Sequence, residues 1–254
     1  MRAHRDFLAA PDWPSLDALN ARLDARPHPR LGIALRFIAQ SLGVPADGLH
    51  YEERIARLGA IATRERNWHD LLNALAWIVD TPIKAALNLR QVRDVAVVGP
   101  RERTRGQCAL TLFDEGGAIV LLRDRTRFAA WDAHDWPAFF HDHAFEVLPF
   151  GHALHEHALV GDSWLVAKGI AVLDERGTLT LDDAAAMVAT AIADGTLLDD
   201  PQSLRPVPLC GLPGWHPRRA EPDFFTAAPC FRPLREGRRY PPPFIPSYTT
   251  SSTT

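Results

Sequence analysis

The chain has 254 residues, of which 46% are hydrophobic, and its formal net charge is −3. It can therefore bury a full core, but it has no overall basic field, which argues against a large nonspecific interface with nucleic acid or an anionic membrane. No apolar run approaches the ~20 residues that cross a bilayer, and the N-terminus lacks the apolar segment of a signal peptide. The three cysteines form neither a CxxC pair nor a zinc-finger pattern, which fits a reducing compartment. We expect a cytoplasmic protein with no membrane segment and no nucleic-acid partner.

Helical periodicity dominates the first third of the chain. Apolar spacing and capping residues predict five helices, over Ser15–Ala25, Leu31–Leu42, Tyr51–Leu58, Trp68–Val79 and from Thr81 onward. Asn67 is a good N-terminal cap for the fourth helix, and Trp68 begins its buried apolar stripe. The N-terminal half is therefore predicted to be helical.

The middle of the chain changes to the periodicity of strands. CALTLFDEGGAIVLLRD predicts two strands joined by a tight turn at Gly116-Gly117, since glycine allows the positive φ angles of such turns. FEVLPF and SWLVAKGIAVLD predict two more strands, and HALHEHAL predicts a helix after Gly151. Thr180 caps a further predicted helix, which Gly195 ends.

Beyond Pro201 the chain is rich in proline and irregular. Its predicted anchors onto the core are the aromatic residues Trp215, Phe224, Phe225 and Phe231. From residue 238 the sequence has no periodic apolar face, which predicts a disordered tail over 238–254. We expect residues 1–237 to form a single globular α+β domain. In this domain a helical N-terminal half packs on a small, mainly antiparallel sheet, and the C-terminal segment is irregular and Pro-rich.

Two consecutive helices each place a pair of polar side chains on one face. His69 and Asn73 are four residues apart, and Lys84 and Asn88 repeat this spacing in the next helix. If the two faces converge, they form a polar pocket; if they diverge, these are solvated side chains. Asp70, the third residue of its helix, has an alternative role in capping, because a carboxylate there complements the exposed backbone amides.

The segment FEVLPFGHALHEHAL places His152 at the start of a helix, directly after a strand. Glu156 follows four residues later, and imidazole and carboxylate groups can together bind zinc, manganese or iron. The order of residues matches neither HExxH nor HxxEH, so a histidine-rich surface helix is the alternative. Asp114 and Glu115 stand before the two glycines, where acidic residues are typical of turns. The sequence contains no GxxxxGK[ST] loop, GxGxxG fingerprint or GxSxG elbow.

Four sequence blocks follow one another between about Tyr51 and Pro233: YEERIARLGAIATRERNWHDLLNALAWIVDTPIKAALN, ALTLFDEGG, FGHALHEHAL and LCGLPGWHP…FF…FRP. They resemble an uncharacterised bacterial family known as domain of unknown function 3025. The polar positions of the family pattern fall on Tyr51, Glu52, Arg54, Arg64, Asn67, His69, Asp70, Asn73, Lys84, Asn88, Asp114, Glu115, His152 and Glu156. Three residues depart from this pattern, His155, His157 and Cys108, which weakens any site that depends on them.

The family has no established activity, but the resemblance implies one shared pocket, because helix packing alone does not require so many ionisable residues. The candidate catalytic residues are His69, Asp70 and His152. The candidate substrate-binding residues are Arg64, Asn73, Lys84, Asn88 and Asp114, and the candidate ligands of a divalent metal cofactor are His152 and Glu156. A single pocket also predicts that His69 and His152 lie close together in the fold.

Three functional hypotheses follow from this pocket. Imidazoles and carboxylates beside cations suit hydrolysis of a small phosphoryl or acyl ester, which is the leading hypothesis. One alternative is a non-catalytic binding module, in which Arg64, Lys84 and Asn88 hold a small anionic metabolite or a nucleotide. Another is a structural protein in which the same groups form a buried polar network. The sequence leaves the oligomeric state open.

Overall fold

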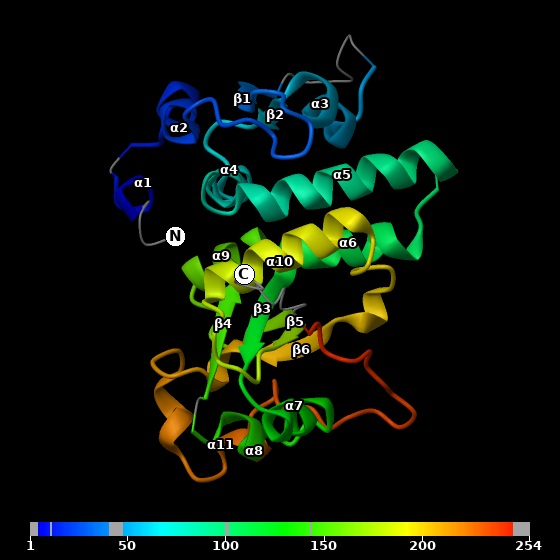
Figure 1. Cartoon of the computed structure of the whole chain (residues 1–254). Coiled ribbons are helices and arrows are strands. Elements are labelled where there is room, and N and C mark those ends of the chain that lie inside the picture. Colours follow the sequence, from blue (N-terminus) through cyan, green and yellow to red (C-terminus); the bar gives the residue numbers. More distant parts are fainter. Residues whose placement is uncertain (1–4, 11, 41–47, 100–101, 143, 246–254) are drawn as a thin grey trace, which may run out of the picture.

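A computed structural model describes residues 5–10, 12–40, 48–99, 102–142 and 144–245 (Figure 1). The N-terminal part contains helices α1 (Arg5–Ala9), α2 (Leu16–Leu23), α3 (Tyr51–Leu58), α4 (Trp68–Val79) and α5 (Thr81–Val98), and strands β1 (Arg36–Ala39) and β2 (Ala60–Thr63). The rest contains helices α6 (Arg105–Gly116), α7 (Arg125–Asp132), α8 (Trp136–Phe140), α9 (His152–Leu159), α10 (Leu181–Asp194) and α11 (Phe224–Ala227), and strands β3 (Gly117–Leu122), β4 (Phe145–Pro149), β5 (Val166–Leu173) and β6 (Arg205–Pro208). The predicted α+β fold is confirmed.

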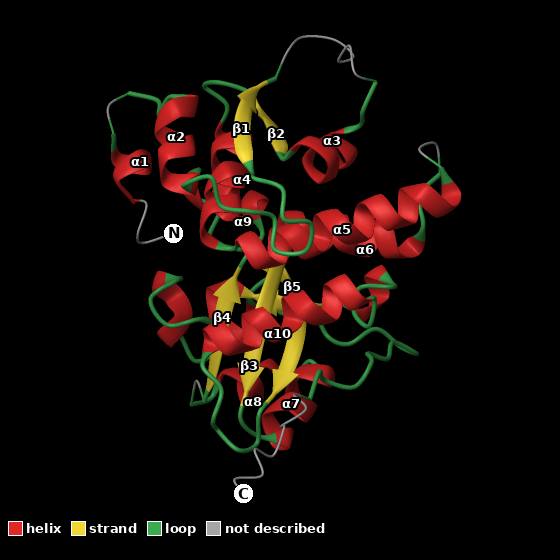
Figure 2. Ribbon diagram, turned by 45° about the horizontal axis from the view of Figure 1, so that its top comes forward, coloured by secondary structure: helices red, strands yellow, loops and turns green. Residues whose placement is uncertain are grey.

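The larger sheet has the strand order β4-β3-β5-β6 (Figure 1), and Figure 2 shows β3, β4 and β5 as neighbouring strands of this sheet. The β3–β4 and β5–β6 pairs are antiparallel, whereas β3 and β5 are parallel. The sheet is therefore mainly antiparallel, as predicted, but not purely so. Alternate residues of β3 face opposite layers: Ile119 and Leu121 pack with α5, α6 and α10, while Val120 and Leu122 pack with α7 and α8.

The predicted helix over Leu31–Leu42 is wrong, because strand β1 forms within this segment; residues 41 and 42 lie outside the described residues. β1 pairs in parallel with β2 along its whole length. The side chain of Asn20 in α2 accepts a hydrogen bond from the Phe37 N–H (2.7 Å) and donates one to the Phe37 carbonyl (2.9 Å). Residues distant in sequence thus supply the hydrogen bonds that hold the backbone of this segment as a strand.

The predicted hairpin is also wrong, because helix α6 continues to Gly116 and β3 begins at Gly117. Gly117 is extended (φ −75°, ψ 152°) and does not make the positive-φ turn that a tight hairpin requires. Thr104 begins α6 with a reciprocal capping box. The buried face of α6 consists of Gly106, Gln107, Ala109, Leu110 and Phe113. Asp114 and Glu115 therefore lie in the last turn of a helix rather than before a surface turn.

Helices α3, α4 and α10 agree with their predictions, and side chains cap α4 and α10. α3 and α4 have their predicted bounds, and the Asn67 side chain caps α4 by accepting the Asp70 N–H at 3.0 Å. α10 follows the predicted cap Thr180 and ends before Gly195. These caps act within one turn of the chain, so they do not depend on the rest of the fold.

Trp68, which was predicted to begin the buried stripe of α4, lies at the surface, whereas Trp77 is buried. Trp68 is 45% exposed and packs against Trp13, with ring centroids 4.7 Å apart. Trp77 is 1% exposed and belongs to the N-terminal core cluster. The face that carries His69, Asn73 and Trp77 therefore runs from the exposed start of the helix into the core.

The C-terminal segment is irregular, and all four predicted aromatic anchors pack against the core cluster of the sheet: Trp215, Phe224, Phe225 and Phe231. The chain continues to make defined contacts beyond residue 238. The guanidinium of buried Arg205 lies 5.1 Å from the ring centroid of Tyr240 and donates to the Pro241 carbonyl. Phe244 forms two backbone hydrogen bonds with β5, 2.8 and 2.9 Å long. These contacts place residues 238–245 with the folded chain rather than with a tail; residues 246–254 lie outside the described part.

Candidate functional site

A cavity of about 440 Å³ lies between α3, α4, α5, α6 and the start of α9, and we call it the polar cavity. Six predicted site residues line it: Arg64, His69, Asp70, Asn73, Asp114 and His152. Three others do not line it but contact residues that do: Lys84, Asn88 and Glu156. The two polar helix faces thus converge, which was one of the alternatives that residue spacing left open.

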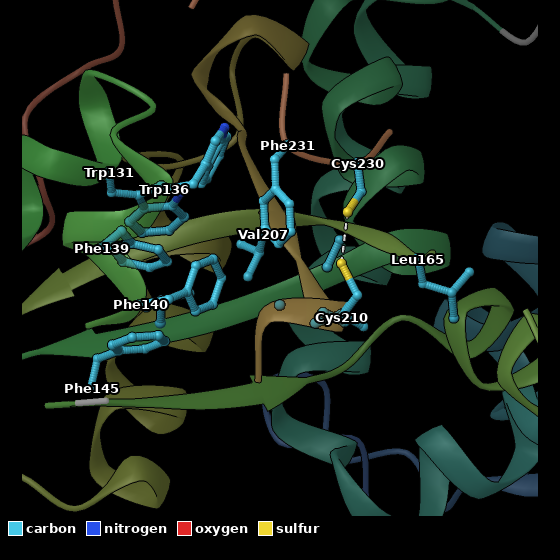
Figure 3. Close-up of a cluster of buried hydrophobic side chains, with 14 of the residues drawn as sticks. Trp131, Trp136, Phe139, Phe140, Phe145, Leu165, Val207, Cys210, Cys230 and Phe231 are labelled. Atoms are coloured by element: carbon cyan, nitrogen blue, oxygen red, sulfur yellow. Dashed lines mark hydrogen bonds between the residues drawn. The ribbon is translucent and has the colours of Figure 1, made fainter. Parts of the chain in front are cut away.

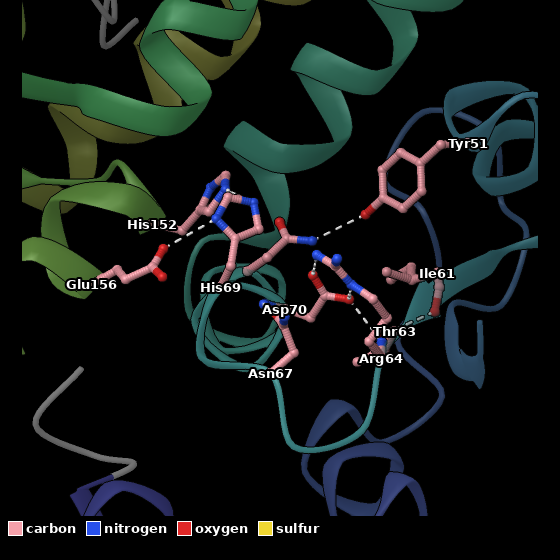
Figure 4. A network of polar contacts seen from close by, with 10 residues as sticks. Tyr51, Ile61, Thr63, Arg64, Asn67, His69, Asp70, His152 and Glu156 are labelled. Atoms are coloured by element: carbon pink, nitrogen blue, oxygen red, sulfur yellow. Dashed lines mark hydrogen bonds and ion pairs between the residues drawn. The ribbon is translucent and has the colours of Figure 1, made fainter. Parts of the chain in front are cut away.

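Two histidines meet at one wall of the polar cavity (Figure 4). His69 Nε2 lies 3.1 Å from His152 Nε2, which confirms the prediction that these residues are close in the fold. His69 is in the first turn of α4, and His152 is the first residue of α9. Gly151 allows α9 to start here, because a Cβ at this position would lie 2.4 Å from the carbonyl oxygen of Glu115 in α6.

Glu156 orients the ring of His69. Its Oε2 lies 3.2 Å from His69 Nδ1, and the two side chains are 39% and 42% exposed. An ionised carboxylate can only accept, so Nδ1 of His69 carries the hydrogen. In neutral His69, Nε2 then has the lone pair, and the hydrogen between the two rings belongs to His152 Nε2. Nδ1 of His152 is consequently an acceptor, and it has no hydrogen-bond partner in the described part of the chain.

His152 is neutral at physiological pH. Its side chain is 4% exposed, and burial lowers its pKa to about 4, with Lys84 and His69 acting in the same direction. Asp114, whose Oδ2 lies 4.0 Å from His152 Nδ1, opposes this shift. Four groups thus form a continuous chain with a carboxylate at each end: Glu156, His69, His152 and Asp114.

Burial of neutral His152 predicts that acid destabilises the protein through this residue. The pKa is about 4 in the folded state and 6.5 in an ordinary histidine, so the unfolded chain takes up the proton first as the pH falls. The contribution of His152 to the free energy of unfolding is complete above pH 6.5 and is lost progressively towards pH 4, by about 3 kcal/mol. Urea unfolding at a series of pH values is expected to show a flatter dependence for His152→Gln than for the wild type. Parallel curves for the two proteins would contradict the buried, neutral state.

The carboxylate of Asp70 forms an ion pair with Arg64. This carboxylate accepts hydrogen bonds from the Arg64 backbone N–H (2.7 Å), Nε (3.0 Å) and Nη2 (2.8 Å). Burial opposes ionisation of Asp70, but the hydrogen bonds and charge of Arg64 outweigh it and lower the pKa of Asp70. Because Asn67 supplies the helix cap, the alternative capping role of Asp70 is not needed. The geometry fits a carboxylate that orients Arg64 better than one that transfers protons.

Lys84 is buried at the centre of a polar network behind the polar cavity. Its Nζ donates to Asn73 Oδ1 (2.8 Å) and Asp114 Oδ1 (2.6 Å), and its side chain is 4% exposed. Asn73 in turn donates to the Tyr51 hydroxyl at 3.0 Å. These bonds connect α3, α4, α5 and α6. Lys84 and Asn73, both predicted to bind substrate, therefore hold the wall of the cavity together.

Asn88 holds a carboxylate that is missing from the predicted site. Its Nδ2 donates to the backbone carbonyl (2.9 Å) and to Oε2 (2.5 Å) of Glu52. Glu52 lines the polar cavity, and burial raises its pKa, with the charge of Asp114 adding to the effect. The signal that pointed to Glu52 was its place in the first family block, next to Tyr51.

The described lining of the polar cavity is acidic. It contains two arginines, Arg64 and Arg103, and five carboxylates, Glu52, Asp70, Glu102, Asp114 and Glu115. Arg64 is paired with Asp70, and Lys84 behind the wall is paired with Asp114. Arg64 and Lys84, which were predicted to bind an anion, are therefore neutralised by carboxylates of the site. Carboxylates thus outnumber cations in the described lining.

The predicted metal ligands, His152 and Glu156, both contact His69 instead of converging on a common point. Across the described ranges, no group of three or more His, Cys, Asp or Glu side chains is arranged to hold a metal ion. The geometry thus supports proton transfer more directly than metal coordination. Within the same ranges, no helix has both the length and the apolar character needed to cross a membrane.

Together, the fold and the polar cavity define an α+β protein with a histidine–carboxylate site. The chain belongs to the family described as "Protein of unknown function (DUF3025)", which matches residues 35–235. This match confirms the resemblance of the sequence blocks and includes every predicted site residue, from Arg64 to Glu156. No curated protein and no solved structure matches the chain.

Proposed function

We propose that this protein is a hydrolase that uses the His69–His152 pair as general base and then as general acid on a small acyl ester. The observation that carries this proposal is the chain of contacts from Glu156 through both histidines to Asp114, at the wall of the polar cavity. When neutral, the pair holds two N–H hydrogens and can accept a third proton from an attacking water. The positive charge that forms then lies between two carboxylates, which stabilise it.

Proton uptake requires only a shift of hydrogens within the pair. In the neutral state, His69 donates to Glu156 and His152 donates to His69. After uptake, His69 carries hydrogen on both nitrogens, and the Nδ1–H of His152 faces Asp114 Oδ2, 4.0 Å away. Transfer of the same proton to the leaving alkoxide returns the pair to its neutral state. Of the four ring nitrogens, Nδ1 of His152 is the one without a hydrogen-bond partner within the described residues. The proton of the attacking water therefore enters at this nitrogen, beside Asp114 at the wall of the polar cavity.

The charge of the lining supports a substrate that is neutral or positively charged. A phosphoryl group would need several unpaired cations, and Arg103 is the one cation of the described lining without an ion pair, so the acyl ester fits this cavity better than the phosphoryl ester. Nη1 of Arg64 makes no hydrogen bond within the described residues, while Nε and Nη2 are held by Asp70. This free end of the guanidinium supplies a donor for the negative charge that develops on the substrate carbonyl oxygen.

The five carboxylates of the lining also favour a second candidate, a non-catalytic module that binds a cationic metabolite. This candidate differs from the anion-binding module considered above, because Arg64 and Lys84 are both paired. It predicts that small amines raise the melting temperature of the protein while no ester is hydrolysed.

The hydrolase proposal is tested with a panel of small acyl esters that carry neutral, cationic or anionic groups. For the best substrate, His69→Gln and His152→Gln are each expected to lower kcat/KM by about 10²- to 10⁴-fold. His157→Gln is the matched control, because His157 is an exposed histidine of the same helix α9, and it should leave kcat/KM unchanged. If no ester is hydrolysed, or if both variants keep wild-type kcat/KM, the proposal is wrong. Stabilisation by amines without turnover would then support the binding module.

A further inference from the structure

A second cavity, of about 960 Å³, lies beside β5 and β6 and beneath the C-terminal segment. It shares no lining residue with the polar cavity. Its described lining contains four cations and one carboxylate, Lys168, Arg232, Arg235, Arg238 and Glu236. We call it the basic cavity. Its charge is opposite to that of the polar cavity, so it suits a ligand of a different chemical class.

Cys230 lines the basic cavity, and Cys210 lies directly behind it. The two Sγ atoms are 2.7 Å apart, and the residues are 8% and 0% exposed, respectively (Figure 3). A disulfide bond is about 2.05 Å long, so the two sulfur atoms would have to approach by less than about 1 Å to form one. Spacing along the chain does not reveal this pair, because the two cysteines are separated by 20 positions.

The aromatic core holds the two thiols in place. Cys210 is the middle residue of the 3-10 turn Leu209–Gly211, and a Cβ on Gly211 would lie 2.6 Å from the ring of Phe140. Cys230 precedes Phe231, whose ring centroid lies 5.9 Å from that of Phe140. Both cysteines belong to this core cluster. Their proximity is therefore set by tight side-chain packing.

The two thiols differ in their access to the basic cavity. The hydrogen bond from Cys210 lowers the pKa of Cys230, whereas the hydrogen bond to Cys230, together with burial, raises the pKa of Cys210. Cys230 also lines the basic cavity, and Cys210 does not. Because Cys230 is the one of the two that lines the basic cavity, it is placed to attack first as a thiolate, and Cys210 second.

We propose that Cys230 and Cys210 form a thiol–disulfide exchange site for a low-molecular-weight disulfide that carries anionic groups. The Cys230 thiolate attacks one sulfur of the substrate and displaces one thiolate, which leaves a mixed disulfide on Cys230. Cys210 then loses its proton, attacks the Cys230 sulfur and displaces the second thiolate. Two protein thiols are oxidised to one disulfide, and the substrate disulfide is reduced to two thiols. The cations of the basic cavity hold the anionic groups of the substrate.

The test uses the reduced full chain and three disulfides that differ in charge: glutathione disulfide (anionic), hydroxyethyl disulfide (neutral) and cystamine (cationic). Intact mass spectrometry of the folded protein is expected to show the loss of two hydrogens, and peptide mapping is expected to place the bond between Cys210 and Cys230. At low salt, the rate with glutathione disulfide should exceed the rate with cystamine by about tenfold, and high salt should reduce this ratio.

Three variants separate the roles of the cysteines. Cys210→Ser should stop at a glutathione adduct on Cys230, and Cys230→Ser should leave Cys210 unmodified. Cys108→Ser is the control, because Cys108 lies on α6, outside the basic cavity, and it should form the wild-type disulfide. If the folded wild-type protein keeps all three thiols, or if Cys210 takes the adduct, the exchange site is refuted. Equal rates with the three disulfides would refute the proposed preference for an anionic substrate.

Discussion

Replacing Trp77 with alanine is expected to lower the free energy of unfolding by about 3 to 5 kcal/mol, the usual cost of deleting a buried aromatic side chain. Trp77 is 1% exposed and packs in the N-terminal core cluster. Its indole N–H has no hydrogen-bond partner within the described residues, so the loss is one of packing. Lys84 Nζ lies 5.5 Å from the ring centroid, so the truncation also removes a cation–π contact behind the polar cavity. Urea unfolding at neutral pH measures the change.

Trp68→Ala is the matched control for this experiment. It is the same substitution in the same helix, but Trp68 is 45% exposed, so its expected cost is below about 1 kcal/mol. The contrast between the two variants reports which face of α4 is buried. If Trp68→Ala costs as much as Trp77→Ala, the assignment of that face is wrong.

Lys84→Met is expected to destabilise the protein by about 3 to 5 kcal/mol. Methionine retains much of the length and volume of lysine, so the variant removes a charge and leaves little cavity. Without the ammonium group, the carboxylate of Asp114, which is 26% exposed, loses its cation, and Asn73 Oδ1 loses a donor. The free energy of unfolding in urea at neutral pH gives the size of this loss.

A double-mutant cycle shows whether the pair itself is responsible. Asp114→Asn in the Lys84→Met background should recover part of the stability, with a coupling energy above about 1 kcal/mol. Lys168→Met is the control, because Lys168 makes no ion pair within the described residues, and it should change stability by less than about 1 kcal/mol. A cost for Lys84→Met as small as that of Lys168→Met would show that the network does not stabilise the fold.

The helices with strong local signals were predictable from the sequence. Asn67 and Thr180 cap α4 and α10 through bonds to residues three positions away, so the necessary contacts lie within the local sequence. β1 could not be predicted in this way, because its hydrogen bonds come from β2 and from Asn20 in α2. The Gly116-Gly117 pair was ambiguous, because two glycines fit the end of a helix as well as a hairpin turn.

The site was predictable as a set of residues but not as a set of contacts. The four-residue spacing placed His69 with Asn73, Lys84 with Asn88 and His152 with Glu156, and the family blocks suggested that these pairs share one pocket. The pairing of Lys84 with Asp114 depends on where α6 lies, and that segment was predicted to be a hairpin. The acidic character of the polar cavity follows from such pairings, so it could not be read from residue types alone.

One edge of β5 is covered only in part by β6. β3 pairs with β5 over Gly117–Leu122 on one edge, whereas β6 pairs on the other edge only as far as Gly169. Phe244 bonds to Ala171 and Leu173, beyond the end of β6. An uncovered strand edge is a template for another chain. Phe244 therefore prevents another chain from pairing with this part of the edge of β5. A protein cut short before Phe244 would be prone to aggregate through β5.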